Sequence, residues 1–311
     1  MSAYVLVTPA HNEEAHLEQV IQSMLRQTRK PLRWVIVNDN STDRTGAIAE
    51  RYAATSNFIH VITIKRDGSR GFNKKAEAFN AGVASLRELR YDVIGNLDAD
   101  ISLEANYFED LLKAFDSEPR LGITGGSVFT TIGGRFVTHD TTPDSVAGAV
   151  QMFRRQCFED VGGRYLPLPF GGIDAAAEII AKARGWLVAK QPAHKAYEHR
   201  QTGTASMTPL AACFRLGRRF HSLGYGMAFY TARCCYRLGD EPVLIGSCAA
   251  FLGYVEALVR RRPVLLAADV VTHLRHEQHR KLWHRFSRVD VGNTATVPGR
   301  AGANGIGRLH T

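Results

Sequence analysis

The stretch Tyr4-Val-Leu-Val-Thr-Pro-Ala-His-Asn-Glu13 joins an apolar run to a polar segment, and this pattern recurs along the first part of the chain. The apolar runs are rich in β-branched residues and have the length of strands buried on both faces. Segments with apolar residues at helical spacing follow, at 17–25, 76–86 and 108–115. The further apolar runs are Trp34-Val-Ile-Val37, His60-Val-Ile-Thr-Ile64 and Val93-Ile-Gly-Asn-Leu97. This β–α alternation predicts an α/β fold with a mostly parallel sheet flanked by helices.

The composition is that of a globular protein. The chain has 311 residues, of which 45% are apolar and 22% charged, which is long enough for two domains. The five cysteines include no Cys-x-x-Cys spacing, which argues against a disulfide framework and a thiolate zinc site and favours a reducing compartment. The first residues lack a basic stretch followed by an apolar core, so no signal peptide is predicted. We therefore expect a cytoplasmic protein.

The excess of positive charge is concentrated late in the chain. The formal net charge is +9, and residues 205–291 contain 13 Arg or Lys against 6 Asp or Glu. From Pro209 onward the pattern is helical. We predict an α/β domain over 1–204, a basic helical extension over 205–291 and a disordered tail, rich in Gly, Ala and Thr, over 292–311.

The basic extension has features of a helix at a membrane surface. Arg215, Arg218 and Arg219 lie at helical spacing beside Leu and Phe residues. Arg260-Arg-Arg262 ends the apolar run 242–259. This pattern suits peripheral binding to the anionic inner face of a membrane, and a solvated helix face is the alternative. The run has 18 residues and one glutamate, which is too short and polar for a span. No nucleic-acid-binding motif accompanies the arginines, so no nucleic-acid partner is expected.

Polar motifs follow two of the apolar runs, where parallel sheets bind their ligands. Asp98-Ala-Asp100 places two carboxylates at a strand end, and these can hold a divalent cation shared with a diphosphate; a solvated turn is the alternative. Asn38-Asp-Asn-Ser-Thr-Asp43 can accept hydrogen bonds from a nucleoside, or Ser41, Thr42 or Asp43 can cap the next helix. A dinucleotide-binding fold is disfavoured because the chain contains no G-x-G-x-x-G or P-loop motif.

Five motifs in order resemble those of the inverting glycosyltransferases of family 2, which have a GT-A type fold. The resemblance covers residues 8 to about 205. The motifs are Thr8-Pro-Ala-His-Asn-Glu13, Val37-Asn-Asp-Asn-Ser-Thr-Asp43, Asn73-Lys-Lys-Ala-Glu-Ala-Phe-Asn-Ala-Gly82, Leu97-Asp-Ala-Asp100, and Phe170-Gly-Gly-Ile-Asp174 with Ala183-Arg-Gly-Trp186. The resemblance implies a metal-dependent hexosyltransferase in glycan or cell-envelope synthesis. It implies a nucleotide-diphosphate sugar donor, with UDP favoured, and a hydroxyl acceptor that is a saccharide or is lipid-linked.

The resemblance also implies roles for individual residues. Asp100, with Asp98, would bind Mg²⁺ or Mn²⁺, and His199 is the candidate third ligand of the metal or diphosphate; the alternative for His199 is an ordinary surface residue. Asp174 is the candidate general base that takes the acceptor's proton, and the alternative is that it caps the helix predicted over 175–184 and closed by Gly185. The residues implied to bind the nucleotide sugar are Pro9, Glu13, Asp39, Lys75 and Asp98.

The chain departs from the family pattern in three places. Asn38 replaces the first acid of the nucleoside motif, and Ile173 replaces the acid before the base. The Gln-x-x-Arg-Trp element of processive synthases is missing, although Gln278-His-Arg-Lys-Leu-Trp283 has a similar composition, so single addition is expected rather than polymerisation. Two alternatives remain open: a nucleotide- or membrane-binding module with a decayed transferase site, and a nucleotidyltransferase.

Overall fold

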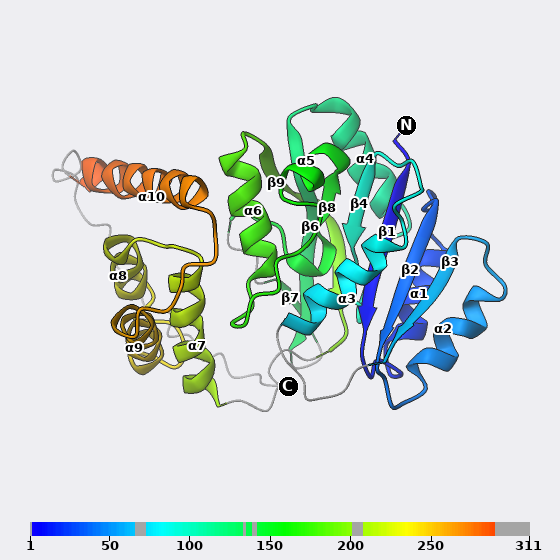
Figure 1. Ribbon diagram of the computed structural model, residues 1–311, viewed down its shortest axis with the longest axis horizontal. Coiled ribbons are helices and arrows are strands. Elements are labelled where there is room, and N and C mark those ends of the chain that lie inside the picture. Colours follow the sequence, from blue (N-terminus) through cyan, green and yellow to red (C-terminus); the bar gives the residue numbers. More distant parts are fainter. Residues whose placement is uncertain (1, 66–72, 133–134, 139–141, 201–207, 290–311) are drawn as a thin grey trace, which may run out of the picture.

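The computed structural model describes residues 2–65, 73–132, 135–138, 142–200 and 208–289. A twisted sheet forms the middle of the molecule, with helices on both of its faces, and helices α7–α10 form a separate group at one end (Figure 1). The tail predicted over 292–311 lies outside the described residues.

The sheet contains nine strands among the described residues, in the order β3-β2-β1-β4-β8-β6-β9-β5, with β7 paired to β6. The strands β3, β2, β1 and β4 pair in parallel, as the apolar runs predicted. Beyond β4 the pairing is mixed, because β8 pairs antiparallel with both β4 and β6 while β6 and β9 are parallel. The bounds are β1(Tyr4–Ala10), β2(Arg33–Asp39), β3(Ile59–Ile64), β4(Val93–Asn96), β5(Ile101–Leu103), β6(Leu121–Ile132), β7(Arg135–Thr138), β8(Met152–Arg154) and β9(Leu187–Glu198). The α/β fold class is therefore confirmed, with strands that are all parallel from β3 to β4 and mixed beyond β4.

The two faces of the sheet carry separate hydrophobic cores. Tyr4, Leu6 and Trp34 pack on one face with α1 and α4, and Val5 and Val7 pack on the other with α3. The strands are thus buried on both faces, as their unbroken apolar runs indicate. The helices of this part are α1(Leu17–Leu25), α2(Thr45–Ala53), α3(Asn73–Ala84), α4(Tyr107–Ser117), α5(Arg155–Asp160) and α6(Ile173–Ala183), with the short 3₁₀ helix η1(Gly148–Val150).

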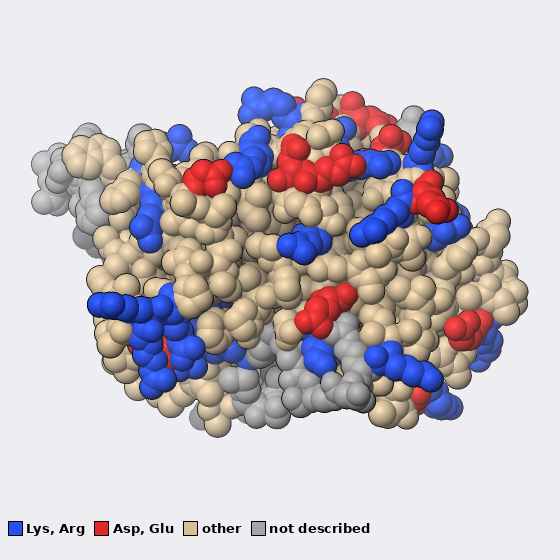
Figure 2. All heavy atoms as spheres, viewed as in Figure 1, with Lys and Arg blue, Asp and Glu red and all other residues tan. Residues whose placement is uncertain are grey.

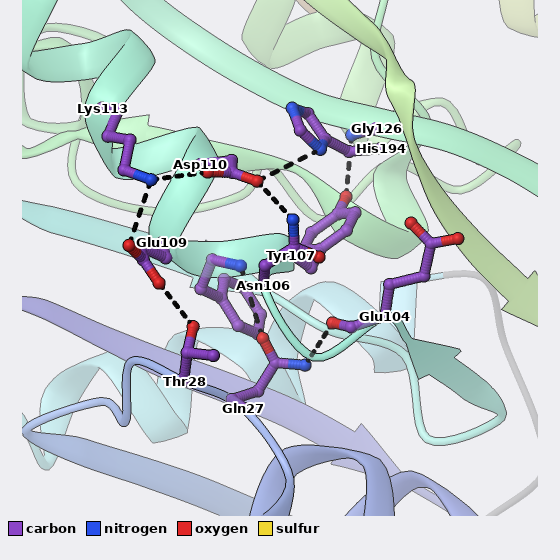
Figure 3. A network of polar contacts seen from close by, with 11 residues as sticks. Gln27, Thr28, Glu104, Asn106, Tyr107, Glu109, Asp110, Lys113, Gly126 and His194 are labelled. Atoms are coloured by element: carbon purple, nitrogen blue, oxygen red, sulfur yellow. Dashed lines mark hydrogen bonds and ion pairs between the residues drawn. The ribbon is translucent and has the colours of Figure 1, made fainter.

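A polar network fixes the start of α4 to the neighbouring elements (Figure 3). Gln27 donates from Nε2 to the Glu104 carbonyl at 2.7 Å, and the Thr28 hydroxyl donates to Glu109 at 2.7 Å. The Tyr107 hydroxyl accepts from the Gly126 backbone N–H at 2.7 Å. The segment that follows Asp98-Ala-Asp100 is therefore held between the end of α1 and strand β6.

The helices of the basic extension are α7(Pro209–Ser222), α8(Met227–Tyr236), α9(Ile245–Val259) and α10(Ala268–Val289). Helix α10 packs on α6 through one hydrophobic cluster that includes Ile179, Leu223 and Val270. Helix α9 begins at Ile245, inside the apolar run 242–259, and ends where that run ends. Among the described residues, none of the helices has both the length and the apolar character needed to cross a bilayer.

Candidate active site

The polar loops that follow β1 and β2 are hydrogen-bonded to each other. The Asn12 backbone N–H donates to the Ser41 hydroxyl at 3.1 Å, and the Glu13 N–H donates to Thr45 Oγ1 at 2.7 Å. His11 Nδ1 lies 2.6 Å from the carbonyl oxygen of Asp39. These contacts bring together the two segments that sequence analysis assigned to nucleoside binding.

Pro9, Asp39 and Asn38 lie at the carboxyl ends of the two paired strands. Pro9 is opposite Val37 in the register of β1 and β2, and Asp39 is the last residue of β2, with only 7% of its surface exposed. The Asn38 side chain accepts from the Ser41 backbone N–H at 3.3 Å. The side-chain oxygen of Asn38 thus holds the start of the loop that follows β2.

The expectation that Ser41, Thr42 or Asp43 caps α2 is wrong in detail. The N-cap position is Arg44, and no side chain caps it. Asp43 instead accepts from the backbone N–H and hydroxyl of Thr45, at 3.0 and 2.5 Å. Although partial burial opposes its charge, these bonds lower the pKa of Asp43.

Asp98 is held from both of its carboxylate oxygens. Lys75 Nζ, from α3, lies 2.7 Å from Oδ2, and Asn96 donates from Nδ2 to Oδ1 at 2.8 Å. Asn96 also donates to the Gly148 carbonyl at 2.5 Å, which ties η1 to the same position. Burial works against the ammonium charge of Lys75, but the adjacent Asp98 carboxylate outweighs it and raises the pKa of Lys75. Lys75 is therefore a fixed positive charge beside the candidate diphosphate position.

Asp100 lies in a crowded cluster of carboxylates. Burial raises its pKa to about 7, and repulsion from Asp98 and Glu13 adds to the effect, which Arg200 partly offsets. The Arg200 guanidinium forms an ion pair with Glu13, and its Nε lies 3.5 Å from Asp100 Oδ2. Burial raises the pKa of Glu13 as well. Sequence reasoning missed Arg200, although it follows directly after the candidate ligand His199.

His199 is next to Asp100 through its backbone. Its N–H donates to the Asp100 carbonyl at 3.0 Å, while its Nε2 lies 2.7 Å from the Ser102 hydroxyl. The ring also lies near that of His16, with 6.5 Å between centroids. Burial lowers the pKa of His199, and the neighbouring His16 acts in the same direction. A neutral imidazole is the form that can ligate a metal.

The carboxylates of this cluster match the chemistry of a cation shared with a substrate. Within the part of the chain that the structure describes, no group of three or more His, Cys, Asp and Glu side chains is arranged to hold a metal by itself. A magnesium or manganese ion that also binds a diphosphate needs only one or two protein carboxylates. The repulsion that raises the pKa of Asp100 is also the kind that a bound cation relieves. Asp98 and Asp100 therefore fit such a shared site.

Asp174 faces a cavity of about 430 Å³. It lies in the first turn of α6, whose N-cap is Gly172 in a left-handed conformation, with φ 86° and no capping side chain. The helix thus begins at Ile173, two residues before the predicted start, and the alternative that Asp174 is the cap is wrong. The residues that line the cavity are Lys75, Gly148, Ala149, Tyr165, Phe170, Gly171, Gly172, Ile173, Asp174, Ala212, Arg215, Leu216 and Arg219.

Gly148 allows the Asp174 carboxylate to come close to η1. A Cβ at residue 148 would lie 2.9 Å from the Asp174 Cβ and 3.0 Å from its Oδ2, which is closer than real Cβ atoms tolerate. Asn96 hydrogen-bonds both to Asp98 and to the Gly148 carbonyl. Since Gly148 also lies against Asp174, the backbone of η1 links the candidate base Asp174 to the donor-binding residue Asp98.

Helix α7 supplies the far wall of the cavity. Arg215 and Arg219 line it, and a Cβ on Gly172 would lie 2.7 Å from Arg219 Cδ. Arg218 contacts Glu256 of α9 at 2.8 Å instead. The three arginines predicted to lie on an exposed basic helix thus contact protein groups and a cavity. Arg218 and Arg219 are consecutive and point about 100° apart around the helix axis, so one meets α9 and the other meets the cavity.

Glu256 forms ion pairs with three arginines. Arg262 Nη2 and Arg260 Nε each lie 3.0 Å from its Oε1, in addition to Arg218. The hydrogen bonds from Arg262 and Arg218 lower the pKa of Glu256 to about 2. Lys and Arg side chains gather on this part of the surface, over α7 and α9 (Figure 2, lower left).

Comparison with known proteins identifies the family. The family model described as "Glycosyl transferase family 2" matches residues 5–177. The Bacillus subtilis protein named "Probable glycosyltransferase YdaM" is 29% identical over 252 residues, which are 76% of this chain and 50% of YdaM. The chain thus spans about half the length of this curated relative, and its matches to EpsJ and EpsH of the same organism cover about a third of theirs.

Two solved structures share the fold. The S. aureus TarS fragment 1-349 in complex with UDP-GlcNAc has a TM-score of 0.51 at 15% identity, covering 80% of this chain and 71% of that one. The mannosyltransferase PcManGT from Pyrobaculum calidifontis, in complex with GDP-Man and Mn²⁺, has a TM-score of 0.53 at 15% identity, covering 94% and 81%. These neighbours are GT-A glycosyltransferases, and they confirm the expected fold. From its sequence motifs, its sheet and the match over residues 5–177, we conclude that the chain belongs to glycosyl transferase family 2.

Proposed function

We propose that the protein is an inverting glycosyltransferase that moves a sugar from a UDP-sugar donor to a hydroxyl acceptor. One observation carries the proposal: Asp174 and Lys75 line the same cavity, and Lys75 is in turn bonded to Asp98. A carboxylate suited to proton transfer and a cation suited to diphosphate binding therefore meet at one space large enough for a sugar.

The donor binds at the carboxyl ends of β1, β2 and β4. Asp39 holds the nucleoside, with Pro9 and Glu13 beside it. Asp98 and Asp100 would share a Mg²⁺ or Mn²⁺ ion with the diphosphate, and His199 would be a further ligand of the ion or of the diphosphate. When bound, this ion neutralises the charge on the departing diphosphate. TarS in complex with UDP-GlcNAc and PcManGT in complex with GDP-Man support a nucleotide-sugar donor of this class.

The transfer is a single displacement. The acceptor oxygen attacks the anomeric carbon while Asp174 takes its proton, and the bond from that carbon to the diphosphate oxygen breaks with its electron pair on the diphosphate. Because attack and departure occur on opposite faces, the anomeric configuration inverts. The ammonium of Lys75 stabilises the developing negative charge.

The substitution Asp174→Asn tests the role of the base. We expect it to abolish release of UDP from UDP-sugars with saccharide and lipid-linked acceptors, while UDP binding in the presence of Mn²⁺ stays within about twofold of the wild type. Asp116→Asn, at an exposed carboxylate that bonds Ser2, is the matched control and should leave both unchanged. If the Asp174→Asn variant transfers sugar at the wild-type rate, Asp174 is not the base. If the protein is only a binding module, the substitution should change neither transfer nor UDP binding.

We also propose that the end of the molecule formed by α8 and α9 rests on the anionic inner face of a membrane, where lipid-linked acceptors are found. Six apolar side chains at this end are more than half exposed, and we call them the apolar surface. Arg260 and Arg261 are exposed beside them. Buried apolar area and attraction between arginines and anionic lipids act together at such a surface. The residues of the apolar surface are Tyr236, Val243, Leu244, Ile245, Leu252 and Val259.

Sedimentation with vesicles tests the membrane contact. The wild type should sediment with phosphatidylcholine vesicles that contain phosphatidylglycerol, and the double change Leu244→Ser and Ile245→Ser should prevent it. Leu32→Ser removes an equally exposed leucine from the opposite part of the molecule and should have no effect. The membrane contact would be contradicted if the wild-type protein stayed in the supernatant, or if it formed a dimer that buries the apolar surface.

A further inference from the structure

Two arginines of the helical extension face the reaction cavity. Arg215 and Arg219 are four residues apart on α7, so they project from one face of the helix. Together with Lys75 they give the described lining three cationic side chains, against the single carboxylate of Asp174. Two of these cations come from α7 and the third, Lys75, comes from α3 on the other side, where it is bonded to Asp98.

The two guanidinium groups repel each other. Partial burial lowers the pKa of Arg215, and the charge of Arg219 lowers it further. Like charges on adjacent turns oppose helix stability, and such a pair at a cavity is the arrangement that an anion relieves. Arg218, between them in sequence, meets the carboxylate of Glu256 instead.

The pair lies near the candidate base. Arg219 lies against Gly172, the N-cap of the helix that carries Asp174. Of the residues assigned to the donor, Lys75 shares this cavity, whereas Pro9 and Asp39 lie at the ends of β1 and β2. We propose that Arg215 and Arg219 form a subsite for a phosphate group of the acceptor, which orients the acceptor so that its hydroxyl reaches Asp174. This inference rests on the proposed transferase function. Guanidinium groups suit the role because their paired N–H donors match two oxygens of one phosphate.

Calorimetric titration with inorganic phosphate and, separately, with UDP and Mn²⁺ tests the subsite. The double change Arg215→Gln and Arg219→Gln should weaken phosphate binding at least about tenfold and leave UDP binding within about twofold. Arg219→Lys keeps the charge but loses the paired donors, so it should weaken phosphate binding less than Arg219→Gln does. Arg280→Gln, at an exposed arginine of α10 in the same helical extension, is the matched control and should change neither affinity.

The source of the phosphate is separated by two further probes. Methyl phosphate represents a soluble acceptor, and phosphatidylcholine vesicles with and without phosphatidic acid represent a lipid one. Arginine-dependent binding of either supports the subsite and identifies which source it prefers.

Three outcomes would overturn the subsite. Wild-type protein that binds none of the phosphate probes excludes it, and so does phosphate binding that survives in the folded double variant. An equal loss of UDP binding would assign the arginines to the donor's diphosphate instead. Failure of the proposed function would give a different result. Wild-type protein would then bind no UDP, while phosphate binding could still be measured and compared between the wild type and the double variant.

Discussion

Arg200 lies between Glu13 and Asp100, with an ion pair to the first and its Nε 3.5 Å from the carboxylate of the second. One side chain from the end of β9 thus joins the loop after β1 to the motif after β4. The guanidinium offsets part of the repulsion that raises the pKa of Asp100. Glu13, Asp98 and Asp100 therefore each lie beside a cation from a distant part of the chain, Arg200 or Lys75.

The substitution Arg200→Gln should destabilise the protein, because it leaves the partly buried carboxylates of Glu13 and Asp100 without this cation. Thermal unfolding should show a lower Tm, and added Mn²⁺ should raise the Tm of the variant more than that of the wild type. Arg51→Gln removes an exposed arginine paired to Glu18 and should show neither effect. A variant with a normal Tm and a normal response to Mn²⁺ would show that the cluster does not need Arg200.

The substitution Gly148→Ala should displace the candidate base. The added methyl group would lie 2.9 Å from the Asp174 Cβ, so the carboxylate or η1 must move. We expect kcat to fall on the order of 10- to 100-fold, because small errors in the position of a reacting group are costly, while the Kd for UDP is unchanged. Gly239→Ala is the control, since a Cβ there meets nothing within 4 Å. Equal kcat values for the two variants would separate Gly148 from catalysis.

Glu178 should make stability depend on pH. Burial raises its pKa from the ordinary 4.5 to about 7, so its contribution to stability is full below pH 4.5 and is lost as pH rises towards 7. Glu178→Gln keeps an acceptor for the Val146 N–H, which lies 2.6 Å away, and cannot ionise. At pH 8 the variant should be more stable to urea by roughly 1–3 kcal/mol, and this advantage should disappear near pH 4. Glu50→Gln, at an exposed glutamate, should show no such crossover.

The first half of the fold could be predicted from the sequence because its signals are local. Each of the strands β3, β2, β1 and β4 is one apolar run, and regular apolar spacing predicted the helices α1, α3 and α4, which follow three of these runs. The second half could not be predicted, because β6 pairs with β8 and β9, and these two pairings join residues far apart in the chain. The Gly125-Gly126 pair, which interrupts the apolar pattern, lies inside β6, beside a shift of register with β9.

The candidate site could be predicted only in part, for the same reason. Asp39 ends β2, and Asp98 and Asp100 lie just beyond the end of β4, so their placement at one edge comes from the topology. Arg200 was missed because its partners Glu13 and Asp100 are distant in sequence. The spacing of Arg215 and Arg219 indicated a shared helix face, but only the packing of α7 shows that this face lines the cavity of Asp174.

Calorimetric binding of UDP with and without Mn²⁺, in the wild type, Asp100→Ala and Asp174→Asn, tests the central claim most directly. The account predicts Mn²⁺-dependent UDP binding that is lost in Asp100→Ala and retained in Asp174→Asn, because the first residue holds the metal and the second acts on the acceptor. Wild-type protein that binds no UDP, or UDP binding that is independent of both Mn²⁺ and Asp100, would contradict it.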